Sequence, residues 1–183
     1  MQTDRIKKAV VELLEAIGKD PNRKELANTP SKVADAYASF FRGIGVDPLS
    51  VLGETFEAVD AEAVILKDIE LVSICEHHLL PFTGVAHVAY LPNKKLAGLG
   101  RLASVIEVLA SRPQLQENLT AEVADALEAG LEAKGVLVVL EARHQCVASR
   151  GARQPEVNTV TMASRGLYTE PGYRAEVLGL ISK

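Results

Sequence analysis

Five of the six cysteine and histidine residues of this chain lie in two short segments. The first segment reads Cys75-Glu76-His77-His78, and the second reads His144-Gln145-Cys146. Thiolate sulfur and imidazole nitrogen are ligands that zinc prefers. A Cys-x-x-His pair and one distant cysteine supply three of them, and three protein ligands leave a tetrahedral zinc one open position, which is typical of catalytic sites. The sequence therefore favours a catalytic zinc site with Cys75, His78 and Cys146 as ligands.

The two remaining histidines of these segments, His77 and His144, would stand beside the metal. Imidazoles ionise near neutral pH, so both are candidates for general acid and base roles. Two alternatives stay open for the cysteines, which could be buried apolar thiols or could pair in a disulfide, the latter disfavoured in a reducing compartment. The sixth residue, His87, alternates with apolar neighbours and is interpreted as a structural histidine.

Basic side chains flank the second segment and the start of a predicted helix. Arg143, Arg150 and Arg153 surround the segment, and Lys94, Lys95 and Arg101 lie in the loop that enters the helix. Arginine side chains and helix N-termini bind phosphate oxygens, so these residues suit an anionic ligand. A solvated basic rim or ion pairs between subunits would explain them equally well. Glu117 could accept hydrogen bonds from the N–H edge of a guanine, or it could interact with the dipole of its own helix.

The elements that must position these residues follow from hydrophobic periodicity. Ile6, Val10, Leu13, Leu14 and Ile17 form one stripe of a first helix. Thr29-Pro30 is typical of an N-cap followed by the first turn of a second helix. Further along the chain, the patterns predict strands at 63–75, 83–91, 136–142 and 157–163, two helices between 102 and 131, and a short helix near 173–181.

This order of elements indicates an α+β fold with helices on one face of an antiparallel four-stranded sheet. Residues 136–140 are apolar on both faces of their strand. Further copies of the same chain would cover the second face, so we expect a homo-oligomer. We expect one domain over residues 1–183, with an N-terminal helical region at 1–61 and the zinc-binding core at 62–183.

Composition excludes several classes of function. The formal net charge is −4, which disfavours binding to the phosphate backbone of nucleic acids. Aromatic residues make up only 4% of the chain, which disfavours stacking on single-stranded nucleic acid. No apolar segment approaches the roughly 18–20 residues that span a bilayer, and the charged N-terminus is unlike a signal peptide. We expect a soluble cytoplasmic protein that binds neither nucleic acid nor membranes.

Three segments taken in order resemble the GTP cyclohydrolase I family: Cys75–Phe82, Gln114–Thr120 and His144–Gly151. The resemblance extends from about Thr29 to the C-terminus. It implies a tunnelling fold with a ββααββ unit and a ring-shaped barrel, usually a decamer of two pentamers, with active sites where subunits meet.

The resemblance also implies roles for individual residues. Zinc would be the cofactor, held by the three ligands named above, with His77 and His144 as the proton-transfer residues. Glu117 would anchor the guanine. Further substrate contacts are expected from four residues: Gln116, Arg101, and the triphosphate-binding Arg150 and Lys32.

The implied reaction is hydrolytic opening of the imidazole ring of GTP, with release of formate and formation of 7,8-dihydroneopterin triphosphate. This is the first step of tetrahydrofolate and pterin biosynthesis. The family commonly reads Gly-Leu-Ser-Lys-Leu-Ala-Arg where this chain has Gly98-Leu99-Gly100-Arg101-Leu102-Ala103-Ser104. Two alternatives are therefore a paralogue that acts on another purine nucleotide with altered phosphate recognition, and a non-catalytic zinc-binding homo-oligomer.

Overall fold

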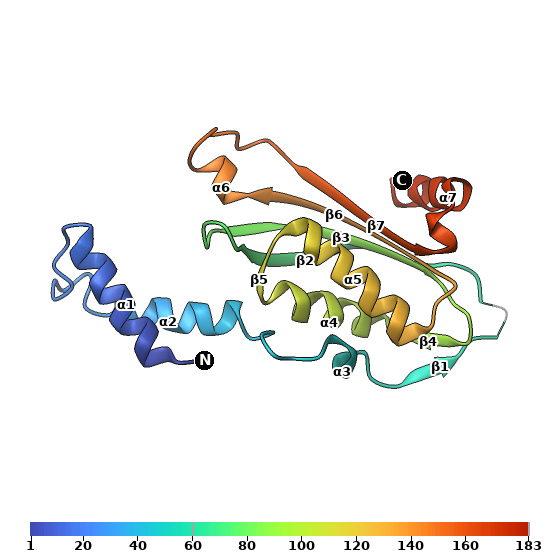
Figure 1. Cartoon of the computed structure of the whole chain (residues 1–183), viewed down its shortest axis with the longest axis horizontal. Coiled ribbons are helices and arrows are strands. Elements are labelled where there is room, and N and C mark those ends of the chain that lie inside the picture. Colours follow the sequence, from blue (N-terminus) through green and yellow to red (C-terminus); the bar gives the residue numbers. More distant parts are fainter. Residues whose placement is uncertain (60, 183) are drawn as a thin grey trace. The chain divides into compact units, whose positions relative to one another are not determined.

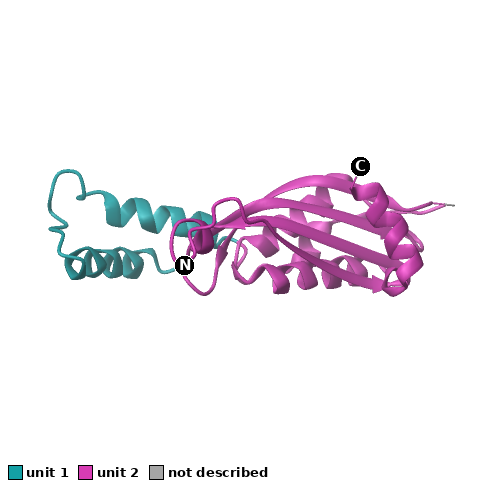
Figure 2. Cartoon of the chain, turned by 90° about the horizontal axis from the view of Figure 1, so that it is seen from above, with its two compact units in different colours: residues 1–42 teal, residues 43–183 magenta. Residues whose placement is uncertain are grey.

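The chain forms two compact units, residues 1–42 and 43–183, in a computed structural model that describes residues 1–59 and 61–182 (Figure 2). The predicted N-terminal helical region extends to residue 61, whereas the second unit begins at Gly43. That all residues form one domain stays a prediction.

The first unit consists of two helices that pack against each other, α1 (Thr3–Ala16) and α2 (Thr29–Phe40). Both helices were predicted. The predicted apolar stripe of α1 is only half buried, because Val10 and Leu14 are buried while Leu13 and Ile17 remain exposed. The N-cap of α2 is Asn28 rather than Thr29, which is already helical.

The second unit is built on a five-stranded sheet with the order β5-β2-β3-β6-β7 (Figure 1). Its four long strands are β2 (Val64–Cys75), β3 (Pro81–Leu91), β6 (Gly135–His144) and β7 (Thr159–Gly166), and neighbouring long strands pair antiparallel. The sheet therefore has one strand more than the four that were predicted. The two-residue strand β5 (Pro113–Gln114) pairs parallel with the end of β2.

The other elements of this unit are α3 (Pro48–Leu52), β1 (Thr55–Glu57), β4 (Lys95–Ala97), α4 (Leu99–Ala110), α5 (Gln116–Leu131), α6 (Gln145–Ala148), the 3-10 helix η1 (Leu167–Thr169) and α7 (Pro171–Ile181). Strands β1 and β4 pair in a separate antiparallel ribbon. The elements α4, α5 and α7 were predicted, whereas the short ones were not. No helix among the described residues is long and apolar enough to cross a membrane.

Strand β6 is buried on both faces, as its continuous apolar sequence predicts. Val136, Val138 and Leu140 pack into the main core together with residues of α4 and α5. Leu137 and Val139 pack on the opposite face with residues of η1 and α7. The expectation of helices on one face only is therefore wrong, because α7 of the same chain covers part of the second face.

Another part of the second face carries exposed apolar side chains. Met162 pairs with Val139 and Val160 with Glu141 across β6 and β7, which places both on the face that bears α7. Val160 is 58% exposed and Met162 48% exposed. This face is thus divided between a part that α7 covers and an apolar part that the described chain leaves open.

Candidate metal centre

A tight turn between β2 and β3 positions Cys75 and His78. Cys75 ends β2, its N–H donates to the Leu80 carbonyl over 2.9 Å, and its own carbonyl accepts from the Leu79 N–H over 2.9 Å. Leu79 has φ of +52°, in the left-handed region, so the chain reverses sharply at this point. The reversal brings His78 back toward Cys75.

The third candidate ligand, Cys146, lies just beyond the end of β6. Phe82 pairs with His144 in the register of β3 and β6, so the end of β6 lies beside the β2–β3 turn. Cys146 follows in α6 rather than on a continuation of the strand. The ligand atoms of Cys75, His78 and Cys146 all lie within 4.8 Å of one another.

The chemistry of these three side chains suits a borderline-soft divalent cation such as zinc. Cys75 is buried, Cys146 is half-buried and His78 is exposed. Burial raises the pKa of Cys146, the adjacent Cys75 thiol raises it further, and Arg150 acts in the opposite direction. A bound cation stabilises neighbouring thiols as thiolates. The donor set therefore fits zinc.

The two other histidines of the motif segments lie beside this cluster in different environments. His144 ends β6, where its ring stacks on Phe82 with centroids 4.6 Å apart and planes 14° from parallel. Burial lowers the pKa of His144, and the charge of Glu117 partly opposes this effect. His77 is exposed in the turn, with its ring centroid 6.2 Å from that of His78.

Two predicted substrate residues begin helix α5. Glu117 is exposed in its first turn, close enough for its charge to act on His144. Gln116 is 1% exposed, and its Oε1 atom lies 2.7 Å from Nε2 of His144. A third predicted residue, Arg150, is exposed shortly after α6 and acts electrostatically on Cys146.

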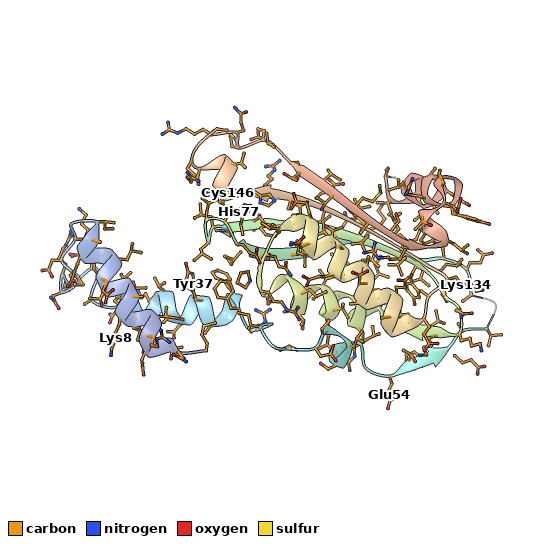
Figure 3. All side chains as sticks on the ribbon, viewed as in Figure 1. Lys8, Tyr37, Glu54, His77, Lys134 and Cys146 are labelled. Carbon is orange, nitrogen blue, oxygen red and sulfur yellow. The ribbon has the colours of Figure 1, made fainter. Side chains whose placement is uncertain are left out.

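The fold of the second unit does not place the remaining two predicted substrate residues, Arg101 and Lys32, at the cluster. Helix α4 begins after β4, at the opposite end of the unit from the β2–β3 turn, and Arg101 lies in its first turn (Figure 1). Figure 3 shows His77 and Cys146 at one end of the sheet and Lys134 at the other. The eleven residues of β3 alone span roughly 35 Å. Lys32 is exposed on α2, in the first unit.

Two contacts of His144 were not expected from the sequence, namely the stacking of Phe82 and the hydrogen bond with Gln116. The stacking depends on the pairing of β3 with β6, which places Phe82 opposite His144, some 60 positions later in the chain. The hydrogen bond depends on the packing of α5 against β6 and β7. The only sequence signal was the position of Phe82 and Gln116 inside the motif segments. His87 was interpreted correctly as a structural residue, because it is buried and its Nδ1 accepts from the Asp68 N–H.

The fold and the site together define an α+β protein with a Cys-His-Cys centre at the end of a mainly antiparallel sheet. Among solved structures, the apo form of the archaeosine synthase QueF-Like is similar, with a TM-score of 0.50 and 17% sequence identity. The similarity covers 59% of this chain and 97% of that one, and it supports a shared fold.

Sequence comparison identifies the family. The family model of GTP cyclohydrolase I matches residues 6–182. Relatives named GTP cyclohydrolase 1 include those of Leifsonia xyli subsp. xyli, 57% identical over 97% of this chain and 94% of the relative, and of Thermobifida fusca, 52% identical over 97% and 87%. The relative from Streptococcus agalactiae serotype V is 47% identical over 98% and 97%. The chain belongs to the GTP cyclohydrolase I family, which confirms the resemblance drawn from its motifs.

Proposed function

We propose that this chain catalyses the zinc-dependent hydrolysis of the imidazole ring of GTP. The products would be formate and 7,8-dihydroneopterin triphosphate, at the first step of tetrahydrofolate and pterin biosynthesis. The observation that carries the proposal is the convergence of Cys75, His78 and Cys146 in a chain of this family. His77 and His144 beside the cluster support catalysis, because a purely structural zinc site has no need of additional imidazoles.

Each residue of the site has a proposed task. Cys75, His78 and Cys146 would hold zinc, which in such sites lowers the pKa of a bound water toward neutrality. His144 would donate a proton to the purine as charge develops during attack on its imidazole ring. His77 would assist collapse of the resulting adduct, in which the carbon–nitrogen bond breaks and the ring opens. The exposed carboxylate of Glu117 would accept hydrogen bonds from the N–H edge of guanine.

Recognition of the triphosphate involves more than one copy of the chain in this proposal. Arg150 would bind phosphate beside the cluster of its own chain. Arg101 lies at the opposite end of the second unit, so it would serve the site of a neighbouring copy. Lys32 would also bind phosphate. We propose a ring-shaped decamer of two pentamers with the tunnelling fold, and the exposed Val160 and Met162 support such an assembly.

The proposed reaction is tested by incubating the purified protein with GTP, with and without a chelator. Formate and, after oxidation, pterin fluorescence are measured. We expect both products to disappear with the chelator and to return with zinc but not with magnesium. Bound zinc without turnover of any nucleotide would favour the non-catalytic alternative. Turnover of another purine nucleotide in preference to GTP would favour the paralogue, which the unusual Gly100 and Ser104 make a relevant competitor.

The shared site is tested by co-assembling two inactive variants. Chains with Arg101→Ala are mixed with chains carrying Cys146→Ser, and activity per chain is measured after co-expression. We expect partial recovery, because some interfaces combine an intact Arg101 with an intact cluster. The matched control mixes chains carrying His144→Ala with chains carrying Cys146→Ser. Both residues belong to the cluster that a single chain forms, so no mixed assembly contains an intact cluster and no activity should be recovered. Equal results for the two mixtures would contradict a site shared between copies.

The proposed location is the cytoplasm. A site that needs two free thiols is compatible with a reducing compartment, where cysteines remain available as ligands.

A further inference from the structure

Gln116 is the centre of a buried hydrogen-bond network that links α5 to two strands. Its Nε2 atom donates to the Leu140 carbonyl over 3.1 Å, to the Thr159 carbonyl over 2.9 Å and to Thr161 Oγ1 over 3.1 Å. Its Oε1 atom lies 2.7 Å from His144 Nε2. With 1% of the residue exposed, these partners occupy both ends of the amide.

The network determines which way the amide of Gln116 points. Backbone carbonyl oxygens can only accept hydrogen bonds, so the side facing Leu140 and Thr159 must be the NH₂ group. The amide oxygen is thereby directed at His144. A rotated amide would place two carbonyl groups against an oxygen and leave the NH₂ donors without these acceptors, which is costly in a buried site.

The orientation of Gln116 in turn determines the hydrogen on His144. An amide oxygen accepts and cannot donate, so Nε2 of His144 must carry the hydrogen of the 2.7 Å bond. In the neutral imidazole only one nitrogen is protonated, which leaves Nδ1 with the lone pair. Among the described residues, no hydrogen bond to Nδ1 of His144 is present.

A second contact restrains the plane of the same ring. Phe82 is fully buried and stacks on His144 with the two planes 14° from parallel. The hydrogen bond limits rotation of the imidazole within its plane, and the stacking limits its tilt. His144 is therefore held at one edge and on one face, while its Nδ1 edge has no such partner.

We propose that Gln116 is a positioning residue that holds His144 as the Nε2–H tautomer, so that His144 exchanges its catalytic proton at Nδ1. This inference rests on the proposed function, in which His144 transfers a proton to the substrate. It differs from a substrate contact by Gln116, which stays a prediction from the sequence.

The direct test is the tautomer of His144 in the wild-type, zinc-loaded full chain. Nitrogen-15 NMR of histidine-labelled, sedimented protein distinguishes the protonated from the unprotonated ring nitrogen, and a His144→Gln variant assigns the signal. The measurement is made near pH 8, above the ordinary histidine pKa of ~6.5. We expect one tautomer, protonated at Nε2. A His144 ring protonated at Nδ1 would overturn the proposal, whether or not the protein turns over GTP.

The second test compares two variants that remove different parts of the network. Gln116→Met keeps the approximate size of the side chain and removes the acceptor for His144. Thr161→Val removes one partner of Gln116 Nε2 and leaves the bond to His144 in place, so it is the matched control. We expect Gln116→Met to lower kcat roughly 10- to 100-fold with KM nearly unchanged, and to change the tautomer signal. Thr161→Val should keep the signal and change kcat by less than about threefold.

The outcomes separate this inference from the proposed function. An increase in KM at unchanged kcat in Gln116→Met would make Gln116 a substrate-binding residue and overturn the positioning role. An unchanged tautomer signal in that variant would overturn it as well. A wild-type protein with the Nε2–H tautomer but no product from GTP would contradict the proposed function and leave the tautomer assignment standing. If Gln116→Met does not fold, the tautomer of His144 in the wild-type protein still tests the proposal.

Discussion

Cys146 shows at the scale of one residue what a cation would contribute to the site. Burial and the neighbouring Cys75 both raise the pKa of its thiol, so two thiolates side by side are unfavourable without a compensating charge. A bound divalent ion would supply that charge, with both sulfurs as its ligands. In the proposed site each cysteine would be necessary, because a tetrahedral site with only two protein ligands binds zinc weakly.

We predict that Cys146→Ser lowers the zinc content from about one ion per chain to less than ~0.1 after dialysis. The serine hydroxyl is of similar size but is a poor zinc ligand. Elemental analysis by mass spectrometry measures the metal, and His77→Ala is the control because it is expected to retain zinc. Full zinc in the serine variant would show that the metal is held elsewhere.

A second prediction at this scale concerns Tyr90, which is fully buried and accepts from the Ala97 N–H over 3.4 Å. Burial raises the pKa of Tyr90 above its ordinary value, with the Ala97 contact acting the other way. A raised folded-state pKa contributes stability that is complete below the unfolded pKa of ~10 and is lost as pH rises from there through the folded pKa. Tyr90→Phe should therefore lose less stability between about pH 8 and 10.5 than the wild type.

Urea midpoints measured at both pH values test this expectation. At pH 8 the phenylalanine variant should be about 1 kcal/mol less stable, since a buried N–H loses its acceptor. An equal alkaline loss in both proteins would exclude Tyr90 as a cause. Burial also raises the pKa of Tyr168, so part of the alkaline loss is expected to persist in the variant.

How far sequence predicts single residues differs between the ligands and their neighbours. Cys75, His78 and Cys146 could be inferred from residue type and spacing, because metal ligands must be chemically specific. The bond between Gln116 and His144 could not, because glutamine is an ordinary surface residue and its burial depends on the packing of α5 under β6 and β7. The ability of Gln116 to orient His144 comes from the residues that bury it and not from its residue type.

At the scale of elements, the pairing of β3 with β6 is what brings the two motif segments together. Gly84 of β3 lies so close to β6 that a Cβ atom placed on it would be 1.9 Å from the Glu141 carbonyl oxygen. No real side chain tolerates that distance, so the strands could not keep their register with any other residue at this position. The glycine is a packing requirement of the strand pair that carries Phe82 and His144.

We predict that Gly84→Ala destabilises the protein by more than ~3 kcal/mol or prevents folding, since the strands must move apart. The matched control is Gly179→Ala in α7, where a Cβ atom meets nothing within 4 Å. That change should stabilise by about 0.5–1 kcal/mol, because glycine is unfavourable inside a helix. Urea denaturation followed by circular dichroism measures both. A mild effect of Gly84→Ala would mean that β3 and β6 can separate without cost.

The long elements were predictable because each buries a regular apolar pattern, as in β2, β3, β6 and α5. Strands β1, β4 and β5 were not, because each has only two or three residues and too few periods to produce a pattern. The position of α7 was predicted from the sequence, but its packing on the second face of β6 was not. Its contacts with Leu137 and Val139 are tertiary, and no local signal specifies them.

At the scale of the whole molecule, the division of the second sheet face bears on assembly. Helix α7 covers one part of that face, so copies of the chain are not needed there. The open part carries Val160 and Met162 on β7, which is also an edge strand of the sheet. An exposed apolar edge strand favours pairing with another chain. Any homo-oligomer is therefore expected to use β7.

We predict that Val160→Lys reduces the mass of the particle measured by light scattering, because a charge on an apolar contact surface is costly to bury. Circular dichroism should show an unchanged fold. Val59→Lys, which replaces another highly exposed valine outside the sheet, is the control and should keep the wild-type mass. Wild-type mass for both variants would show that this part of the face is not an interface.

The three candidate ligands are unevenly spaced along the chain, and this spacing has a consequence for folding. Cys75 and His78 share one short turn, whereas Cys146 comes about 70 positions later. A cation held by all three would act as a reversible crosslink that closes the loop of chain between the turn and Cys146. Demetallated protein should therefore show faster amide exchange around Cys146, while the slowly exchanging interior of the sheet changes least.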